Sequence, residues 1–498
     1  MQKKVIVIGA GLGGIAAAVS LAAEGFNVDV YEKNNQIGGK LNVLEKEGFG
    51  FDLGPSIFTL PHLFERLFKR AGKKMEDYLT LQPVTPHWRN FFEDGTVVDL
   101  YKDEQKMKAE LDKLGVGLFE EFTKFRKYSA RQYDIVEKGY FDKGLDNTWE
   151  FIKFYPWIDL LWKLDSLGTM DKGVRKFFSN PYLIDIFNFF IKYVGSSAIQ
   201  APAFFNLMPH IQFEYDLWYV KDGMYNLARG LKRLMDDLQI KIHLGSEVRR
   251  IEKSGSNVTG IRLENGETRK ADIVVSNMEV IPAYKELLGE EDAFMKGLEK
   301  FEPACSGLVL HLGTDKIYEN LAHHNFFFSQ NQSEHFNTVF KEHKLPHDPT
   351  LYVVAPTRTD SSKAPAGCDN IKVLPHIPYI DDENPYTEED YRNLRNQVLD
   401  KLERTALPGL REHIIVEDMW TPVDIQRNYF SNKGSVYGVV SDREKNFGFK
   451  APKQSSRYSN LYFTGGSVNP GGGMPMVVLC GQNVCDRIVR NEAKGLHG

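Results

Sequence analysis

A glycine-rich loop near the start of the chain, GAGLGG at residues 9 to 14, has the spacing of a dinucleotide-binding turn. Gly9, Gly11 and Gly14 satisfy G-x-G-x-x-G, whose glycines allow a tight turn, close approach of backbone to a pyrophosphate, and close packing of helix on strand. Glu32, at the end of VDVYE, is placed to accept hydrogen bonds from ribose hydroxyls. Because an acid at this position disfavours a 2′-phosphate, we expect a nucleotide other than NADP.

A second glycine pair follows the acidic strand end, in NNQIGGKLN at residues 34 to 42. Gly38 and Gly39 offer another place where backbone can pass a diphosphate, and Lys40 adds positive charge there. Farther on, GFGFDLGPSIF at residues 48 to 58 ends an aromatic-rich strand in a further turn. A NAD site needs neither element, whereas the longer FAD has use for both, so they favour FAD. Ordinary turns are the alternative on spacing alone.

The elements around these loops predict an α/β fold. KVIVI at residues 4 to 8 is a β-branched run typical of a strand buried on both faces of a parallel sheet, and the residues after the first loop read as a helix. VDVYE at residues 28 to 32 supplies the next strand, and ADIVVS, ending at residue 276, returns the chain to the same sheet. We therefore expect a discontinuous Rossmann-type domain.

The middle of the chain reads differently. Residues 62 to 214 are helical and aromatic, apart from a β-hairpin signal around Glu93-Asp94-Gly95 in HWRNFFEDGTVVDLY, residues 87 to 101. Residues 305 to 420 are rich in strands and predict a substrate-binding sheet. The 33 Phe and 22 Tyr residues suit a long conjugated ligand. An ordinary Phe-rich core is the alternative.

Composition excludes several classes of function. The net charge of −5, from 62 basic and 67 acidic residues, gives no support for a nucleic-acid partner. The four cysteines form no CxxC, and His323, His324 and His376 have no second ligand at helical or hairpin spacing, so we expect reduced thiols, a cytoplasmic protein and no metal site. No eighteen consecutive residues are apolar, which excludes a spanning helix. FIKFYPWIDLLWKL, residues 151 to 164, predicts either a helix at a membrane interface or a buried lid helix.

GAGLGG, Glu32, GGK, FDLGPS and the closing GGSVNPGGGMPM at residues 465 to 476 together resemble the carotenoid and phytoene desaturase family of FAD-dependent flavoproteins, which is allied to the amine oxidases. The likeness runs over nearly the whole chain and is nearest to the C30 carotenoid branch of desaturases and oxygenases. It implies FAD as cofactor, a C30 carotenoid as substrate and a membrane surface as its source. The regions it predicts are an FAD-binding domain over 1–85, 215–295 and 431–498, a helical lid region over 86–214 with possible membrane contact, and a substrate-binding sheet over 296–430.

On this resemblance, the closing loop is the other half of the cofactor site. LYFTGG would be the last strand of the nucleotide sheet, and a helix would begin in GGGMPMVV with Pro475 in its first turn. Free N–H groups around Met476 and Val477 would face the flavin, and Val248 would touch the adenine side through its backbone. A glycine-rich turn before a terminal helix is the alternative. The expected cofactor-binding residues are Gly9, Ala10, Gly11, Gly13, Gly14, Glu32, Gly39, Lys40, Val248, Gly465, Gly466, Met474, Met476 and Val477.

The chain lacks GxSxG, HExxH and any paired nucleophile and base. A hydrocarbon polyene has no carbonyl to polarise and no leaving group to protonate, so its oxidation relies on the flavin, while the protein positions the substrate and keeps the site dry. Only one dinucleotide fingerprint is present, and FAD is expected to occupy it. No pocket for NAD(P)H is therefore indicated, so molecular oxygen or a membrane quinone is the expected oxidant.

The closing motif bears on the choice of reaction. The family's desaturases typically carry Thr-His-Pro-Gly where this chain has Val468-Asn469-Pro470-Gly471. We therefore expect Asn469 to be a catalytic residue that distinguishes the reaction of this chain from desaturation. LAHHNFFFS, KVLPHIPYI, KYVGSS and SNMEVIP also resemble the oxygenases. The resemblance implies oxidation of a terminal methyl of 4,4′-diaponeurosporene or 4,4′-diapolycopene to an aldehyde, by a protein attached peripherally to a membrane. Diapophytoene desaturation, amine oxidation and non-enzymatic carotenoid carriage are the alternatives.

Overall fold

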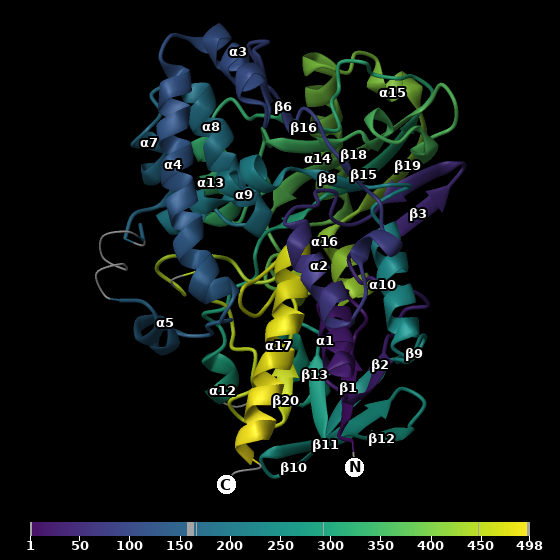
Figure 1. Cartoon of the computed structure of the whole chain (residues 1–498). Helices are drawn as coiled ribbons and strands as arrows, with labels where there is room; N and C mark the ends of the chain where they lie inside the picture. The colour runs from purple at the N-terminus through teal and green to yellow at the C-terminus, as the bar shows by residue number, and fades with distance from the viewer. Residues whose placement is uncertain (1, 157–163, 166, 292, 447, 496–498) are drawn as a thin grey trace.

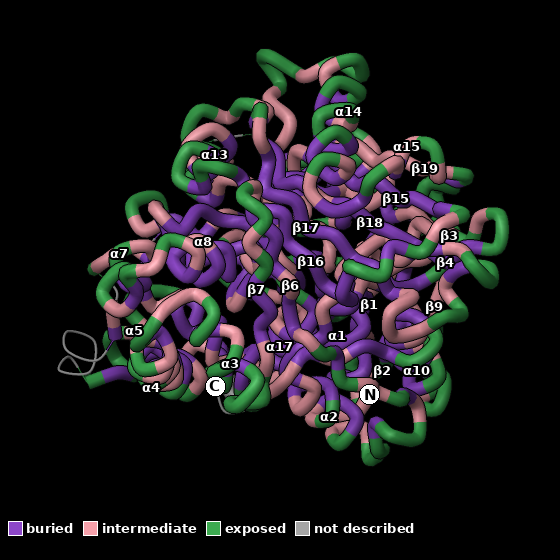
Figure 2. Tube along the Cα trace, turned by 90° about the horizontal axis from the view of Figure 1, so that it is seen from above, coloured by how far each residue is buried: buried purple, intermediate pink, exposed green. Residues whose placement is uncertain are grey.

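The computed structural model describes residues 2–156, 164–165, 167–291, 293–446 and 448–495 (Figure 1). In Figure 1 a parallel sheet with both chain ends lies in the lower half of the view, a group of helices lies at the upper left, and a second sheet lies at the upper right. The most deeply buried backbone runs through the middle of the molecule, where these parts meet (Figure 2).

The lower sheet has five strands in the order β20-β13-β1-β2-β9, and every neighbouring pair is parallel. Their bounds are β1 Lys4–Ile8, β2 Asn27–Tyr31, β9 Lys241–His243, β13 Ile273–Ser276 and β20 Leu461–Phe463. The apolar residues of β1 and β13 are buried, as expected for central strands covered on both faces. The predicted strands at residues 4 to 8, 28 to 32, 273 to 276 and in LYFTGG are confirmed, and so is the return of the chain to one sheet.

Two helices from opposite ends of the chain pack together beside this sheet. Helix α1, Leu12–Ala23, follows β1, and helix α17, Met474–Gly495, lies along it (Figure 1). Their separation is small at Gly481, where an added Cβ would lie 2.6 Å from the carbonyl oxygen of Gly13 and 2.6 Å from the nitrogen of Ala17. Pro475 is in the first turn of α17, as predicted.

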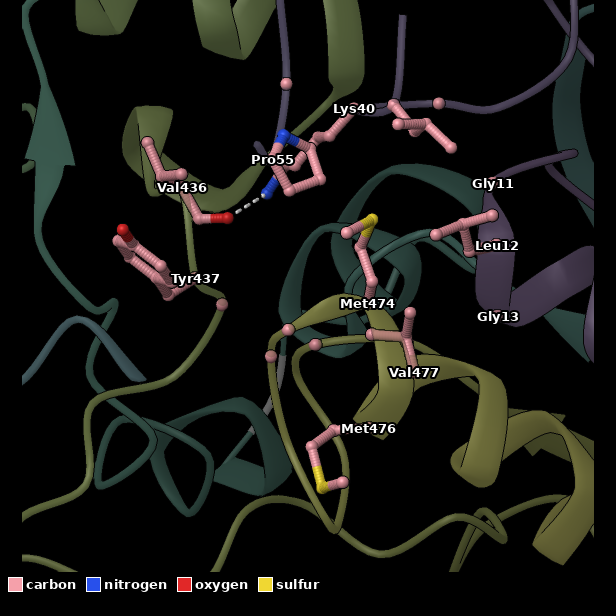
Figure 3. A pocket seen from close by; sticks show the side chains of 18 of the residues that line it. Gly11, Leu12, Gly13, Lys40, Pro55, Val436, Tyr437, Met474, Met476 and Val477 are labelled. Atoms are coloured by element: carbon pink, nitrogen blue, oxygen red, sulfur yellow. Dashed lines mark hydrogen bonds between the residues drawn. The ribbon is translucent and has the colours of Figure 1, made fainter. Parts of the chain in front are cut away.

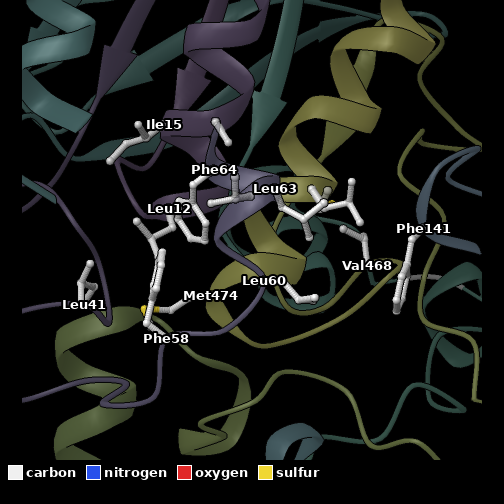
Figure 4. Close-up of a cluster of buried hydrophobic side chains, with 14 of the residues drawn as sticks. Leu12, Ile15, Leu41, Phe58, Leu60, Leu63, Phe64, Phe141, Val468 and Met474 are labelled. Atoms are coloured by element: carbon white, nitrogen blue, oxygen red, sulfur yellow. The ribbon is translucent and has the colours of Figure 1, made fainter. Parts of the chain in front are cut away.

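Apolar side chains join α1 and α17 to helix α2, Pro61–Arg70 (Figure 4). Leu12, Phe64 and Met474 come from the three helices, and the ring of Phe58 contacts that of Phe64 in a tilted arrangement, with centroids 4.7 Å apart. This core fixes the first and last glycine loops relative to each other. Helix α10, Asn226–Asp237, also packs against α1.

The second sheet is mostly antiparallel, with the path β19-β15-β18-β17-β16-β6-β7. Its strands are β6 Trp88–Phe91, β7 Val97–Leu100, β14 Ser306–Gly307, which pairs with β18 off this path, β15 Val309–Thr314, β16 His324–Phe327, β17 Leu351–Val354, β18 Asp369–Ile377 and β19 Ile414–Trp420. The predicted hairpin is therefore confirmed. It joins the sheet through a parallel pairing of β6 with β16. Two strands from residues 88 to 100 therefore belong to the same sheet as the strands between residues 306 and 420.

Helices α14, Glu388–Thr405, and α15, Leu410–His413, lie near this sheet in Figure 1. Smaller elements complete the strand-rich parts. They are β3 Val43–Lys46 with β4 Phe49–Asp52, β5 Leu81–Pro83 with β8 Trp218–Val220, the antiparallel set β10 Val248–Ser254, β11 Asn257–Leu263 and β12 Thr268–Lys270, and the short helices η1 Met75–Asp77, α11 Val280–Pro282, η5 Ala283–Leu287, α12 Ala293–Lys296, α13 Gln332–Phe340, η6 Pro356–Arg358, η7 Ser361–Lys363, α16 Pro422–Tyr429 and η8 Asn432–Gly434.

The predicted helical, aromatic region is present between residues 104 and 215. It contains α3 Glu104–Leu114, α4 Leu118–Val136, the π-helix η2 Glu137–Phe141, α5 Thr148–Phe154, α7 Met170–Arg175, α8 Pro181–Phe189, η3 Phe190–Val194, η4 Ala203–Leu207 and α9 Met208–Tyr215. Of the segment predicted to be an interface or lid helix, residues 157 to 163 lie outside the described residues. In the part of the chain that is described, no helix is long and apolar enough to cross a membrane.

Candidate active site

A cavity of about 430 Å³ lies where the two sheets and the helical region meet. Its wall combines the loop after β1, residues 38 to 41, 53 to 57, 59 and 60, the closing glycine loop with the start of α17, and residues of β17 and β18. Figure 3 shows the first loop, Lys40, Pro55 and the start of α17 around this space. The two glycine-rich stretches, far apart in the sequence, therefore line one space.

The first glycine loop forms one end of this cavity. Gly9 has φ +93°, a conformation that favours glycine. A Cβ on Gly11 would lie 2.6 Å from Asn277 Oδ1, so a larger residue at this position would require Asn277 to shift. No side chain caps α1, and its first turn contains no acidic residue. The free N–H groups of this turn suit a phosphate, and the loop thus fits the pyrophosphate of a dinucleotide.

Glu32 lines the same end of the cavity and is nearly buried. One carboxylate oxygen, Oε2, accepts a hydrogen bond from the Ala10 N–H at 2.7 Å, and the other accepts from the Asn34 N–H at 2.9 Å. The acid is thereby fixed between the first loop and the end of β2. Its remaining lone pairs fit the predicted role of ribose acceptor.

Lys40 also lines the cavity, but its ammonium is held by protein groups. Nζ donates to the carbonyls of Ser435 at 2.9 Å and Val436 at 3.0 Å, and lies 3.3 Å from the Glu279 carboxylate (Figure 3). The predicted contribution of free charge to a diphosphate is therefore reduced. The side chain instead ties the second glycine loop to the segment before Tyr437.

The closing loop supplies the opposite wall. Gly465, with φ +111°, and Gly466 line the cavity, together with Met474, Met476 and Val477 at the start of α17. The prediction of free N–H groups here is wrong for Val477, whose N–H donates to the Gly473 carbonyl at 3.0 Å. The helix has already begun its own hydrogen bonding at that residue.

Of the remaining predicted cofactor residues, some line the cavity and others do not. Gly13, Gly39 and Val248 line the cavity, with Val248 at the first residue of β10. Ala10 and Gly14 are outside the lining: Ala10 donates to Glu32, and a Cβ on Gly14 would lie 2.1 Å from the Gly9 carbonyl oxygen. These two residues shape the loop.

The family model described as "Flavin containing amine oxidoreductase" matches residues 12–489. The chain belongs to this family. It is therefore a flavin-dependent oxidoreductase, and the predicted cofactor, FAD, is confirmed. The fit of the two glycine loops agrees with this assignment.

Close relatives of this flavoenzyme are similar over nearly their full length. It is 56% identical over 488 residues to 4,4′-diapolycopene oxygenase of Methylomonas sp, covering 98% of each chain. It is 51% identical over 498 residues to 4,4′-diaponeurosporene oxygenase of Staphylococcus aureus (strain USA300), covering 99% of each chain.

Solved structures of low sequence identity share the fold of this flavoenzyme. Putrescine oxidase has a TM-score of 0.63 at 15% identity, covering 98% of this chain and 99% of the other. Cyclohexylamine oxidase from Brevibacterium oxydans IH-35A has a TM-score of 0.61 at 16% identity, covering 99% of this chain and 100% of the other. The predicted α/β flavoprotein architecture is confirmed.

Asn469 is fully buried in this flavoenzyme and is outside the cavity lining. Its Oδ1 accepts from the Tyr140 hydroxyl at 2.6 Å and the Lys450 N–H at 2.8 Å, while Nδ2 donates to the carbonyls of Asp146 at 3.0 Å and Lys450 at 3.2 Å. It reaches the cavity through Tyr140 and Pro470, which both line it. The catalytic role of Asn469 stays a prediction.

Several cavity residues of the flavoenzyme were not predicted from the sequence. Asn277 directly follows β13 and contacts the first glycine loop, a position that the predicted strand end could have indicated. Lys372 donates from Nζ to the carbonyls of Asp52 at 3.0 Å and Gly54 at 2.6 Å, and burial lowers its pKa to about 8. It holds the FDLGPS turn against the second sheet.

The far end of the cavity combines apolar side chains with a few polar ones. Its apolar residues are Val136, Phe141, Phe204, Phe205, Leu207, Met208 and Ile211. Its polar residues are Lys192, Tyr193, Gln212, Tyr352 and Tyr437. One sequence signal for this group is the lysine within the aromatic run FNFFIKYVG, residues 187 to 195.

Proposed function

We propose that this flavoenzyme oxidises a terminal methyl group of a C30 carotenoid, 4,4′-diaponeurosporene or 4,4′-diapolycopene, to an aldehyde. The observation that carries the proposal is the identity of 51% and 56%, over nearly full length, to two curated C30 carotenoid oxygenases. The apolar far end of the cavity supports it, because a polyene chain needs an apolar channel leading to the cofactor.

FAD, when bound, supplies the electron acceptor for C–H oxidation. The chain's own residues have simpler tasks. Glu32 and the first glycine loop hold the nucleotide, and the close packing of α1 on α17 fixes the two glycine loops relative to each other. The side chains of the far end orient the polyene and exclude water, which keeps the reacting carbon in one position.

The oxidant is proposed to be molecular oxygen or a quinone. With oxygen, the balance is R–CH₃ + O₂ → R–CHO + H₂O; with a quinone Q, it is R–CH₃ + H₂O + 2 Q → R–CHO + 2 QH₂. The aldehyde oxygen comes from O₂ in the first case and from water in the second. Incubation with ¹⁸O₂, under conditions that limit exchange of the aldehyde with water, followed by mass spectrometry therefore distinguishes them.

Asn469 is proposed to act as a positioning residue. It accepts a hydrogen bond from Tyr140, which lines the cavity, and it precedes Pro470 in the closing loop. Its side-chain hydrogen bonds join the closing loop to Tyr140, Asp146 and Lys450, which supports a role in holding that wall.

A membrane surface is proposed as the source of substrate, with α5 as the contact. Trp149, Ile152 and Phe154 of this helix are 74%, 53% and 38% exposed, and Lys153 accompanies them. Phe151 packs on Phe449 with ring centroids 5.7 Å apart, and Phe449 packs in turn on Tyr140 of the cavity at 5.9 Å. Exposed aromatic and aliphatic residues beside a lysine suit the interface of a bilayer.

Liposome flotation tests this contact. The double variant Trp149→Ser/Ile152→Ser is expected to leave the liposome fraction, whereas Val116→Ser, at another exposed apolar residue, is expected to remain with it. Equal flotation of both variants would argue against α5 as the contact.

Expression in cells that accumulate 4,4′-diaponeurosporene tests the reaction. Chromatography and mass spectrometry of the pigments are expected to show a product that has gained one oxygen and lost two hydrogens. A product that has lost hydrogens without gaining oxygen would instead identify a desaturase. Unchanged pigment from a flavin-loaded protein would reject both.

A further inference from the structure

The structure describes five buried lysines, and four of them have polar partners for their ammonium groups. The partners include the carbonyls of Asp52 and Gly54 for Lys372, the Asp348 carboxylate for Lys401, the Ser441 hydroxyl for Lys450 and the Asp146 carboxylate for Lys453. This is the ordinary arrangement, since a buried amine without hydrogen bonds is unfavourable.

Lys192 is the exception. It lies on η3, the turn that follows the buried helix α8, and only 5% of the residue is exposed. Among the residues that the structure describes, its Nζ has no hydrogen-bond or ion-pair partner. Four rings surround the amine instead, with centroids at 4.2 Å for Tyr352, 4.5 Å for Phe326, 4.6 Å for Tyr193 and 4.9 Å for Trp88.

An aromatic cage does not replace the water that a lysine loses on burial. Ring faces attract a cation, but they accept hydrogen bonds poorly and offer no counter-charge. Burial lowers the pKa of Lys192 well below its ordinary value of 10.5. The amine therefore retains N–H groups that are available to a hydrogen-bond acceptor inside the cavity, whose wall Lys192 helps to form.

Two tyrosines of the cavity wall add further polar atoms: Tyr352, whose ring is part of the cage around Lys192, and Tyr437. The Tyr352 hydroxyl lies 3.0 Å from His324 Nδ1, and the Tyr437 hydroxyl lies 3.1 Å from His376 Nε2. Burial lowers the pKa of both histidines, that of His376 to about 3, so both imidazoles are neutral and can accept the phenol protons. Each phenol oxygen then keeps acceptor capacity of its own, and both tyrosines line the cavity.

A hydrocarbon has no use for this group of polar atoms. The amine offers donors to a carbonyl or hydroxyl oxygen, and the phenol oxygens offer acceptors to a hydroxyl hydrogen. Such a set of donors and acceptors suits an end group that already contains oxygen.

We propose that Lys192 donates a hydrogen bond to the terminal oxygen of an oxygenated C30 carotenoid, so that the cavity accepts the parent hydrocarbon as substrate but binds the alcohol or aldehyde formed from it more tightly. This inference rests on the proposed function. It assigns to Lys192 a role in specificity, with the carbon chain held by the apolar side chains and the oxygen held by the amine.

The test is a binding titration with the flavin-loaded protein in detergent. The ligands are 4,4′-diaponeurosporene and its terminal aldehyde, and the readout is quenching of tryptophan fluorescence, to which Trp88 in the cage contributes. Lys192→Met is expected to weaken aldehyde binding about tenfold and to leave hydrocarbon binding unchanged, because one hydrogen bond is lost. Lys192→Gln, which keeps N–H donors, is expected to recover part of the loss. Ile211→Ala is the matched control at an apolar position and is expected to weaken both ligands alike.

Equal weakening of both ligands by Lys192→Met, or no weakening of either, would overturn the proposal. If this variant does not fold, as judged by its flavin content, the wild type decides: equal affinity for the two ligands rejects the proposal, and tighter binding of the aldehyde supports it. Borohydride treatment of the wild type with the aldehyde provides another check, because a mass increase on the peptide containing Lys192 would indicate an imine and contradict hydrogen-bond recognition. Failure of the wild type to convert the hydrocarbon in cells would reject the proposed reaction separately, since the binding ratio does not depend on turnover.

Discussion

The Glu32 carboxylate accepts a hydrogen bond from the backbone N–H of Ala10 at 2.7 Å. The acid that is expected to bind the ribose therefore also holds the first glycine loop in shape. Binding the ribose requires the cofactor, whereas holding the loop does not, so the two roles of Glu32 can be measured separately.

Replacing Glu32 is expected to weaken the binding of FAD. Glu32→Ala removes a charge-assisted acceptor, and the loss of roughly 1.5 to 3 kcal/mol corresponds to about a 10- to 150-fold higher Kd. Titration of the apoprotein with FAD, followed by flavin fluorescence, measures the change. Glu65→Gln, at an exposed residue of α2, is the control and is expected to bind FAD like the wild type. An unchanged Kd in Glu32→Ala would show that the acid has no part in binding the cofactor.

Asn469 is expected to matter for stability as well as for the product. Asn469→Asp replaces the Nδ2 donor with an oxygen that faces the carbonyls of Asp146 and Lys450, which leaves two buried acceptors without a partner. We expect a loss of about 2 to 4 kcal/mol in the free energy of unfolding, measured by urea denaturation with circular dichroism. A variant with normal stability and altered pigment products would instead place Asn469 in the chemistry.

A buried ion pair beside Asn469 predicts that substitutions of its two residues have non-additive effects on stability. Lys453 and Asp146 are both 1% exposed and in contact, and Arg487 lies 3.1 Å from the same carboxylate. Asp146→Asn is expected to lower the free energy of unfolding by about 3 to 5 kcal/mol, because a lysine stays buried without its counter-charge. The double variant Asp146→Asn/Lys453→Met is expected to recover much of this loss.

The exposed pair of Lys108 and Asp112 is the matched control for this experiment. Asp112→Asn is expected to change the free energy of unfolding by about 0.5 kcal/mol or less. If Asp146→Asn cost as little as Asp112→Asn, the buried pair would contribute nothing measurable to stability.

Asp185 predicts a pH dependence of stability. Burial raises its pKa from 3.8 to about 6, with the nearby carboxylate of Asp171 adding to the effect and Arg175 opposing it. Between pH 3.8 and about pH 6 the folded protein binds this proton more tightly than the unfolded chain does. The stability that Asp185 contributes is therefore fully present below pH 3.8 and is lost as the pH rises through about 6. Asp185→Asn is therefore expected to stabilise the protein at pH 7 to 8 by roughly 1 to 2 kcal/mol, after allowance for the partial exposure of the side chain.

Thermal unfolding of wild type and Asp185→Asn between pH 4 and pH 8 tests this expectation. The difference in Tm is expected to shrink as pH falls from 6 toward 4. A difference that stays constant across the range would mean that the titration of Asp185 does not cause it.

Local patterns predicted much of the fold. The buried strand at residues 4 to 8 and the hairpin at 87 to 101 follow from β-branched runs and turn residues. Pro475 marked the start of the last helix because its fixed φ and missing N–H suit the first turn. These features depend on neighbouring residues, so they are visible in the sequence.

The cavity was harder to predict because it depends on residues that meet only in the folded chain. Lys40 was expected to face a diphosphate, but Glu279 and two carbonyls hold its ammonium. Val477 was expected to offer a free N–H, but the carbonyl of Gly473 accepts from it. Tyr437 and Lys192 come from different elements, and no spacing in the sequence links them.

The Thr464 hydroxyl donates a hydrogen bond of 3.4 Å to the Gly13 carbonyl. These two residues are 451 positions apart in the sequence. A ribosome makes the chain from its N-terminus, so the loop that receives the nucleotide is complete long before the residues that form the opposite wall exist. Contacts of such high sequence separation form slowly and late. Tight capture of the flavin must therefore wait until α17 has been synthesised and has packed on α1, and a truncated chain that lacks this helix would keep only half of its cofactor site.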